Sequence, residues 1–292
     1  MPDSPKLKND GKAKSLPRRQ RALIIGLLTL CVLTLIVVVL RVISYPRTSQ
    51  LTGQIFYTRE GIGFKESIGL NLQTGERTAY APTPEPPYDP ALYYAWQNSP
   101  DGKWHINSID NGIYNGENAF FEITDTKTHE TRVVGPFYGG PSYIWSPDSQ
   151  SLFFVGMEEP FTMNTFDESK TEVWRLDVAN YQIIRLTNNT YSDSRMQISP
   201  DGTKMAHIGT PNSQGVLYIM DLATGQSTTP SALKLSSDMS VVSFSWSPDS
   251  QWITFEADQK GLSDIYLMRV NGSELQGIAT EPYLWERGPI WR

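Results

Sequence analysis

The fold is decided by a four-residue turn that occurs four times: Ser99-Pro100-Asp101-Gly102, Ser146-Pro147-Asp148-Ser149, Ser199-Pro200-Asp201-Gly202 and Ser247-Pro248-Asp249-Ser250. Proline presets the second turn position, aspartate can hydrogen-bond the local backbone from the third, and glycine supplies a left-handed fourth residue. Where serine replaces that glycine, we expect slight strain. A structural role for the four aspartates therefore outweighs a catalytic one.

The segments around each turn have strand character. An apolar run follows each turn, from Lys103, Ser151, Lys204 and Gln251, and a large apolar residue precedes three of them. Second hairpins follow, with predicted two-residue turns at Thr74-Gly75, Ala179-Asn180, Thr224-Gly225 and Asn271-Gly272. Each unit of about 45 to 50 residues thus predicts four antiparallel strands, which is typical of one β-propeller blade.

This repeat resembles the PD40 repeat of TolB-like β-propellers. The resemblance lies in the W-S-P-D turn, the apolar strand that follows it, an I-Y-x-M strand and a short turn, and it covers residues 53–292. It implies an all-β propeller fold. It does not by itself imply a particular function.

The two ends of the repeat region predict one shared blade. Residues 53–80 match the second, third and fourth strands of a unit, whereas Gly288–Arg292 match a first strand. Pairing these segments would close the ring and remove exposed sheet edges. The sequence therefore predicts five four-stranded blades, although six is the commonest number in the family.

The N-terminal region predicts a membrane anchor. Residues 1–21 form a basic tail, residues 22–44 are apolar enough to span a bilayer as one helix, and residues 45–52 would be a linker to the propeller at 53–292. The positive-inside rule would place the N-terminus in the cytoplasm and the propeller outside the plasma (inner) membrane. A cleaved signal is the alternative.

The charge of the remaining chain excludes several ligand classes. Residues beyond the tail contain 18 basic and 29 acidic side chains, so their net charge is 18 minus 29, or −11. Such a surface repels nucleic acids. The single cysteine, Cys31, lies in the predicted span, and we expect no metal or other cofactor.

Candidate binding residues lie in the predicted crossovers between blades. These connections, among them 135–142, 187–195 and 279–288, should gather at one end of the blades, opposite the tight turns. Aromatic and acidic side chains there could bind a protein, a peptide or a glycan. Packing between blades is the alternative role. The candidates are Tyr88, Tyr138, Tyr191, Asp193, Tyr283, Trp285 and Glu286.

The sequence favours a non-catalytic binding scaffold over an enzyme. No G-x-S-x-G or H-E-x-x-H motif occurs. A propeller-type glycoside hydrolase would need carboxylates on the first strands of its blades, and the predicted first strands (95–98, 142–145, 195–198, 242–246 and 289–291) contain none. Asp193 and Glu286 stand just before two of them and could still point inward. A ligand-sensing subunit of a membrane complex is the third alternative.

Overall fold

The computed structural model describes residues 51–80, 97–109, 119–157, 171–230, 233 and 239–292. These residues belong to one compact unit that begins at Thr48. They form antiparallel β-sheets, with one short 3-10 helix, η4 (Pro211–Ser213). The all-β prediction is therefore confirmed.

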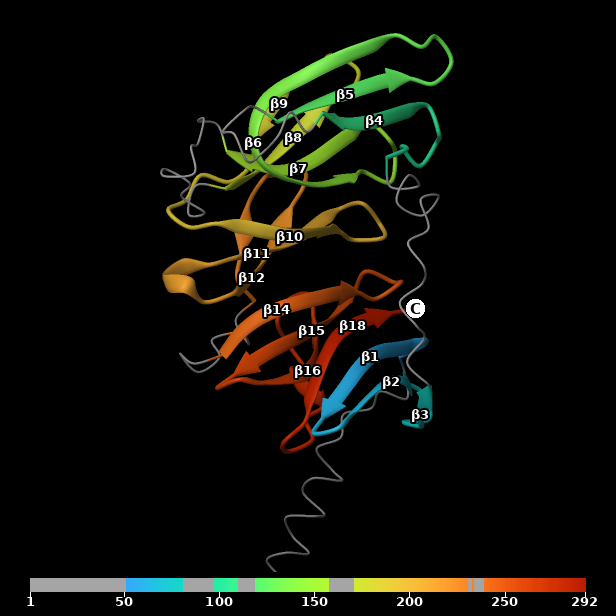
Figure 1. Cartoon of the computed structure of the whole chain (residues 1–292), viewed down its shortest axis with the longest axis vertical. Helices are drawn as coiled ribbons and strands as arrows, with labels where there is room; N and C mark the ends of the chain where they lie inside the picture. The colour runs from blue at the N-terminus through green and yellow to red at the C-terminus, as the bar shows by residue number, and fades with distance from the viewer. Residues whose placement is uncertain (1–50, 81–96, 110–118, 158–170, 231–232, 234–238) are drawn as a thin grey trace, which may run out of the picture. The chain divides into compact units, whose positions relative to one another are not determined.

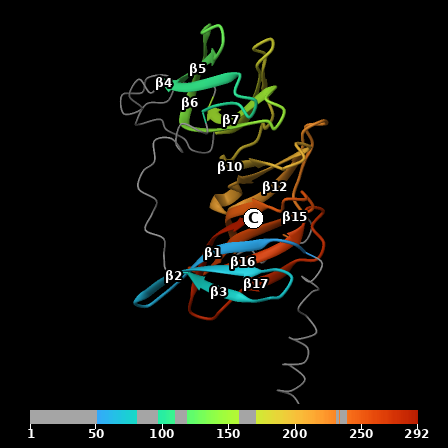
Figure 2. The same cartoon turned by 90° about the vertical axis from the view of Figure 1, so that its right-hand side faces the viewer.

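One four-stranded sheet joins the two ends of the repeat region. Its order is β18-β1-β2-β3, with bounds β18 Trp285–Trp291, β1 Gln54–Gly61, β2 Phe64–Asn71 and β3 Arg77–Tyr80. Figure 1 shows the red β18 beside the blue β1, and Figure 2 shows β2 and β3 continuing the sheet. The predicted pairing of the C-terminal segment with the N-terminal strands is confirmed.

Close backbone contacts hold β18 against β1. Gln54 and Arg292 exchange two backbone hydrogen bonds of 2.8 and 2.9 Å. The indole Nε1 of Trp291 donates to the carbonyl of Thr52 at 3.2 Å. Gly53 has a φ of +96°, and a Cβ there would lie 2.4 Å from the carbonyl oxygen of Arg292. Only glycine allows this approach of the two chain segments.

Two further sheets have the predicted four-strand order. One contains β10 Asp193–Ile198, β11 Lys204–Gly209, β12 Val216–Asp221 and β13 Ser227–Thr228. The other contains β14 Met239–Trp246, β15 Trp252–Gln259, β16 Leu262–Arg269 and β17 Gln276–Ala279. In both, the first strand begins earlier than the sequence predicted. Asp193 therefore lies inside β10 rather than in a crossover. Because β18 also begins earlier than predicted, at Trp285, Glu286 likewise lies inside a strand.

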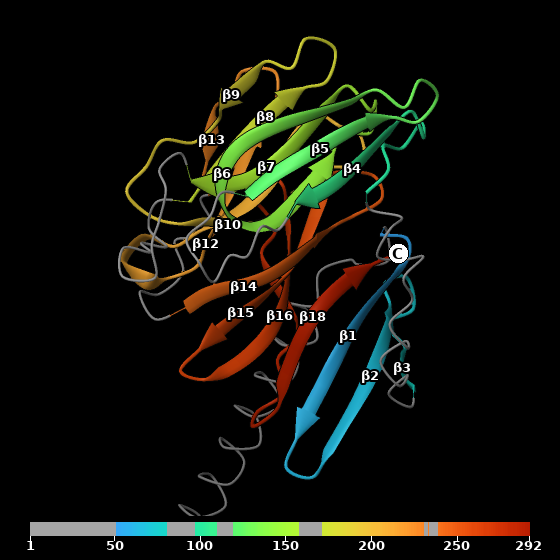
Figure 3. The same cartoon turned by 45° about the horizontal axis from the view of Figure 1, so that its top comes forward.

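The remaining strands form one six-stranded sheet instead of two separate blades. Its members are β4 Trp104–Ile109, β5 Ala119–Asp125, β6 Thr131–Trp145, β7 Ser151–Met157, β8 Glu172–Asp177 and β9 Ile183–Arg185. The crossover predicted at 135–142 is wrong, because β6 runs unbroken through it and pairs first with β5 and then with β7. Figure 3 shows this strand passing from one partner to the other.

The four Ser-Pro-Asp turns have the predicted geometry. In each, the serine hydroxyl donates to the aspartate two residues later, at 2.5 to 2.6 Å. The residue after the turn donates its N–H back to the same carboxylate. These hydroxyl contacts hold the pKa of Asp101, Asp148 and Asp201 below the usual aspartate value.

The serines that replace glycine connect neighbouring turns. Ser149 and Ser250 both have a φ of 61°, so the expected strained conformation is present. Their hydroxyls accept hydrogen bonds of 3.0 Å from the backbone N–H of Asp101 and Asp201, which belong to the preceding turns. A glycine could not make this contact.

We expect Ser149→Ala to lower the free energy of unfolding by about 1 kcal/mol, because it removes the acceptor for Asp101 and keeps a side chain at positive φ. Ser149→Gly should be nearly neutral, since relief of the backbone offsets the lost contact. Urea unfolding midpoints of the two variants measure the difference. A larger loss for glycine than for alanine would contradict this explanation.

The second hairpins are longer than the predicted two-residue turns. A carboxylate or amide oxygen at the first position accepts the N–H groups two and three residues on, as Asn71, Asp125, Asp177 and Asp221 do. This side-chain contact favours a five-residue connection that closes on a left-handed residue. That residue is Gly75, His129, Tyr181 or Gly225.

Apolar side chains from neighbouring sheets share common cores. Met196, Met205 and Met220 of the β10–β13 sheet pack with buried residues of the six-stranded sheet. Ile208 and Leu217 pack with residues of β14 and β15, and β15 to β17 share the last cluster with β1, β2 and β18. Face-to-face packing of successive sheets is what a propeller requires.

Candidate binding site

Bulges interrupt the first strands of three sheets at matching places. The pairing register shifts between Ser194 and Gln197 in β10 and between Val241 and Ser243 in β14. The pairing of β18 with β1 shifts between Phe56 and Thr58. Bulges redirect side chains and often lie beside functional sites.

The three bulges gather around one pocket of about 430 Å³, which we call the bulge pocket. It lies in the halves of the strands away from the Ser-Pro-Asp turns, that is, at the crossover end. Its lining residues come from β10, β14, β15, β16 and β18, and they are Arg195, Val242, Ser243, Glu256, Asp258, Ser263, Arg287 and Gly288.

The carboxylates of the bulge pocket accept hydrogen bonds from other residues of the protein. Glu256 is buried, and its Oε2 accepts from the hydroxyl of Ser243 at 2.8 Å and from the N–H of Gly288 at 3.0 Å. Asp258 accepts from the N–H of Gly261 at 3.2 Å. These contacts join β14, β15 and β18 and fix the pocket wall.

The cations of the bulge pocket are directed to solvent. Arg195 and Arg287 are exposed, and neither forms an ion pair within the described parts of the chain. The guanidinium carbon of Arg287 lies 5.9 Å from the ring centre of Trp285. The pocket therefore offers two guanidinium groups to a ligand.

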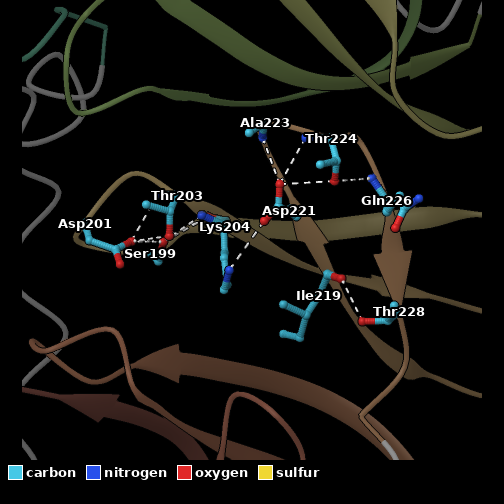
Figure 4. Close-up of polar contacts among 10 residues, drawn as sticks. All are labelled: Ser199, Asp201, Thr203, Lys204, Ile219, Asp221, Ala223, Thr224, Gln226 and Thr228. Carbon is cyan, nitrogen blue, oxygen red and sulfur yellow. Dashed lines mark hydrogen bonds and ion pairs between the residues drawn. The ribbon is translucent and has the colours of Figure 1, made fainter.

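A second concavity lies at the turn end, where the sequence predicted only tight turns. This turn-end cleft has a volume of about 540 Å³ and lies between the β10–β13 and β14–β17 sheets. Lys204 and Asp221 form part of its wall, and Nζ of Lys204 lies 3.6 Å from Oδ2 of Asp221. Figure 4 marks this ion pair with a dashed line. Oδ1 of Asp201 and Oδ1 of Asp221 accept from their own turns. The cleft thus offers a ligand fewer uncommitted charged groups than the bulge pocket.

The predicted site residues lie in several different parts of the structure. Tyr88 lies outside the described residues, and the backbone of Tyr138 lies in β6 and pairs with Met157 of β7. Tyr283 is 84% exposed in the connection before β18. The other candidates are Tyr191, Asp193, Trp285 and Glu286, which lie in or just before β10 and β18.

Tyr191 and Asp193 belong to a largely buried cluster. Oδ1 of Asp193 lies 3.2 Å from Nδ1 of His207, and its Oδ2 accepts from Asn189 at 2.8 Å. The rings of Tyr191 and His207 both stack on the ring of Tyr218, with ring centres 5.8 and 5.3 Å from its centre. Burial, followed by a hydrogen bond with Tyr218, raises the pKa of Tyr191. This arrangement connects β10, β11 and β12.

Trp285 and Glu286 belong to a separate group on β18. The indole of Trp285 donates to the carbonyl of Gly261 at 2.6 Å. Glu286 is fully buried, its Oε1 accepts from the N–H of Glu281 at 3.4 Å, and its Oε2 has no hydrogen-bond partner. Burial, reinforced by the nearby Asp264 and Glu281 carboxylates, raises the pKa of Glu286 to about 7.

The sequence did not single out Arg195, Glu256, Asp258 or Arg287. Glu256 and Asp258 interrupt the mainly apolar run that begins at Trp252. These two acidic residues in a predicted strand were the only sequence feature that could have indicated the pocket. No local pattern marks the bulges, because they depend on the register with distant strands.

Within the described residues, no group of acidic, histidine or cysteine side chains could hold a metal ion. The same residues include no helix long and apolar enough to cross a membrane. The span predicted at 22–44 lies outside them.

Known proteins resemble this chain over part of their length. The Protein TolB homolog of Chlorobaculum tepidum is 26% identical over 102 residues, which is 35% of this chain and 22% of that protein. TolB from Acinetobacter baumannii is 17% identical, with 78% of this chain and 53% of that chain covered at a TM-score of 0.45. Oligogalacturonate lyase from Vibrio parahaemolyticus is 12% identical, with 79% and 63% covered at a TM-score of 0.48. The chain thus spans less than two thirds of each.

The repeats themselves match a family description. The model of the PD40 family, the TolB beta propeller domain, matches residues 142–288. This range contains three of the four Ser-Pro-Asp turns and all three bulges in part or in full. Since it is half of the 292-residue chain, the protein belongs to the PD40 TolB β-propeller family.

Proposed function

We propose that this protein is a non-catalytic scaffold that binds a protein or peptide partner at the crossover end of a five-bladed propeller. The observation that carries the proposal is the bulge pocket, where three sheets bring charged side chains of both signs to one concave surface. Binding residues carried on rigid strands lose little conformational entropy when a partner docks.

The same proposal includes the arrangement of the chain in the cell. Residues 22–44 would anchor the protein in the plasma (inner) membrane, with the propeller outside the cytoplasm. The five blades would be the sheet that joins both ends, the β10–β13 and β14–β17 sheets, and two blades that share β6. A glycan is the alternative ligand to a protein.

Photo-cross-linking of the full chain tests the position of the binding face. A photoreactive phenylalanine analogue at Tyr283 should give a discrete protein adduct, because this side chain is 84% exposed at the crossover end. The matched control is Val133, which is 59% exposed and lies near the turn end. Adducts from Val133 alone, or from neither site, would reject the crossover end as the binding face.

A glycan-cleaving enzyme is the second candidate, because Asp193 and Glu286 lie on first strands after all. The raised pKa of Glu286, about 7, would suit a general acid. Both carboxyl groups are nevertheless buried, with side chains that a substrate could reach only after rearrangement. Glycan cleavage that Asp193→Asn abolishes would favour the enzyme over the scaffold.

A further inference from the structure

We propose that the bulge pocket recognises a carboxylate group of the partner, held between the guanidinium groups of Arg195 and Arg287. This inference rests on the proposed binding function and specifies its ligand chemistry. Both arginines line the pocket, both are exposed, and neither has an ion-pair partner within the described ranges.

The backbone of Arg195 has an unusual conformation for a residue in a strand. Ten residues other than glycine have a positive φ in the described part of the chain, and nine of them lie in turns, connections or η4. Arg195, with a φ of 46°, is the one inside a strand. Side chains are disfavoured in this conformation, and such outliers concentrate at functional sites.

The position in β18 that corresponds to Arg195 is occupied by a glycine, Gly288, so a glycine would also fit at position 195. Gly288 stands three residues before Trp291, as Arg195 stands three residues before Ile198, and its φ is 62°. Both residues follow the same bulge pattern and line the same pocket. Retaining arginine at a position suited to glycine therefore points to a use for its side chain.

The acidic side chains of the bulge pocket accept hydrogen bonds within the protein, whereas its arginines form no ion pair within the described residues. Oε2 of Glu256 accepts from Ser243 and from Gly288, and Oδ1 of Asp258 accepts from Gly261. The acidic groups thus shape the wall, while the guanidinium groups keep their donors. The ring of Trp285 lies 5.9 Å from the guanidinium carbon of Arg287, which limits the side-chain positions that Arg287 adopts.

Guanidinium groups match carboxylates through two parallel N–H···O bonds. A polyanion is disfavoured, because residues beyond the basic tail carry a net charge of −11. A single carboxylate on a partner protein meets both conditions. It could be a C-terminal carboxylate or the side chain of an aspartate or glutamate.

Peptide titrations followed by NMR of the arginine side-chain N–H groups test the inference on the full chain. Three peptides separate the sources: one with a free C-terminus and no acidic side chain, one amidated with an internal aspartate, and one with neither group. Binding of the first or the second identifies the source of the carboxylate. Equal binding of the third peptide would overturn the inference.

Arg195→Gly distinguishes a binding role from a structural one. We expect it to raise the unfolding midpoint, because glycine relaxes the backbone, and yet to weaken peptide binding by about tenfold. Arg195→Lys and Arg287→Ala should weaken binding similarly. His129→Gly is the matched control, since His129 is exposed with a φ of 61° in a distant turn, and it should leave binding unchanged.

The two proposals fail in different ways. An adduct from Tyr283 together with full peptide binding by Arg195→Gly would remove the carboxylate site and leave the scaffold function standing. Carboxylate binding that depends on both arginines, without any adduct from Tyr283, would support the site and reject the proposal that a protein partner supplies the carboxylate.

Discussion

Deletion of Gly288–Arg292 is expected to unfold the β-sheets cooperatively, because this segment contains the C-terminal part of β18, the first strand of the sheet that joins the two ends of the repeats. The deletion removes both hydrogen bonds with Gln54 and uncovers the edge of β1. It also removes Trp291, which is buried in a core cluster with Ile55 and Trp252. Loss of the far-ultraviolet strand signal, or a melting transition far below that of the parent, measures the effect.

A single substitution measures the contribution of the Trp291 side chain while the strand itself is kept. Trp291→Ala should lower the free energy of unfolding by about 3 to 5 kcal/mol, as expected for a buried tryptophan. The control is Ile290→Ala on the same strand, whose side chain is 48% exposed and should cost less than about 1 kcal/mol. A truncated chain that melts like the parent would show that the sheets are stable without this closure.

The second large effect is a loss of stability as the pH rises, caused by Glu286. The pKa of this carboxyl is about 7 in the folded protein, against an ordinary value of 4.5, chiefly because it is buried. Between these values the folded state holds a proton that the unfolded state has released. The free energy of unfolding therefore falls across this window, by up to about 3 kcal/mol.

Glu286→Gln should remove this dependence, because the amide stays neutral. We expect the variant to be more stable than the parent at pH 8 and nearly equal to it at pH 4.5, in urea unfolding at both values. Glu76→Gln, at an exposed position of a hairpin, is the control and should follow the parent. An unchanged difference between the two pH values in Glu286→Gln would assign the effect to another group.

The Ser-Pro-Asp turns have the opposite effect on how stability depends on pH. The pKa of Asp101, Asp148 and Asp201 is lowered in the folded protein, mainly by the serine hydroxyls. Their contribution is therefore present above the ordinary value of 3.8 and is lost as the pH falls through their lower folded values. The contribution of these three aspartates and Glu286 taken together is therefore greatest in mildly acidic solution.

The local features of the fold could be predicted from the sequence. Each Ser-Pro-Asp turn is specified by four adjacent residues, so its chemistry is visible without knowing the partner strands. The pairing of β18 with β1 was also predictable, because the missing strand at one end of the repeats matched the surplus strand at the other. The number of blades and the membrane anchor remain predictions.

The features that depend on distant partners could not be predicted. The continuity of β6 and the bulges at Arg195 and Val242 follow from how neighbouring strands twist and pair, which no short motif records. The sequence therefore placed Asp193 and Glu286 in crossovers, although they lie in strands. It predicted a binding face at the crossover end from aromatic residues such as the exposed Tyr283, which stays a prediction, and it did not single out the arginines.

The joined sheet also determines when the protein can finish folding. Trp291 and its hydrogen-bond partner Thr52 are 239 positions apart in the sequence, so β1 is synthesised long before the strand that completes its sheet. Until then, β1 offers an unpaired edge to any neighbouring strand. During synthesis, this open edge is therefore the part of the sheet most exposed to pairing with another chain.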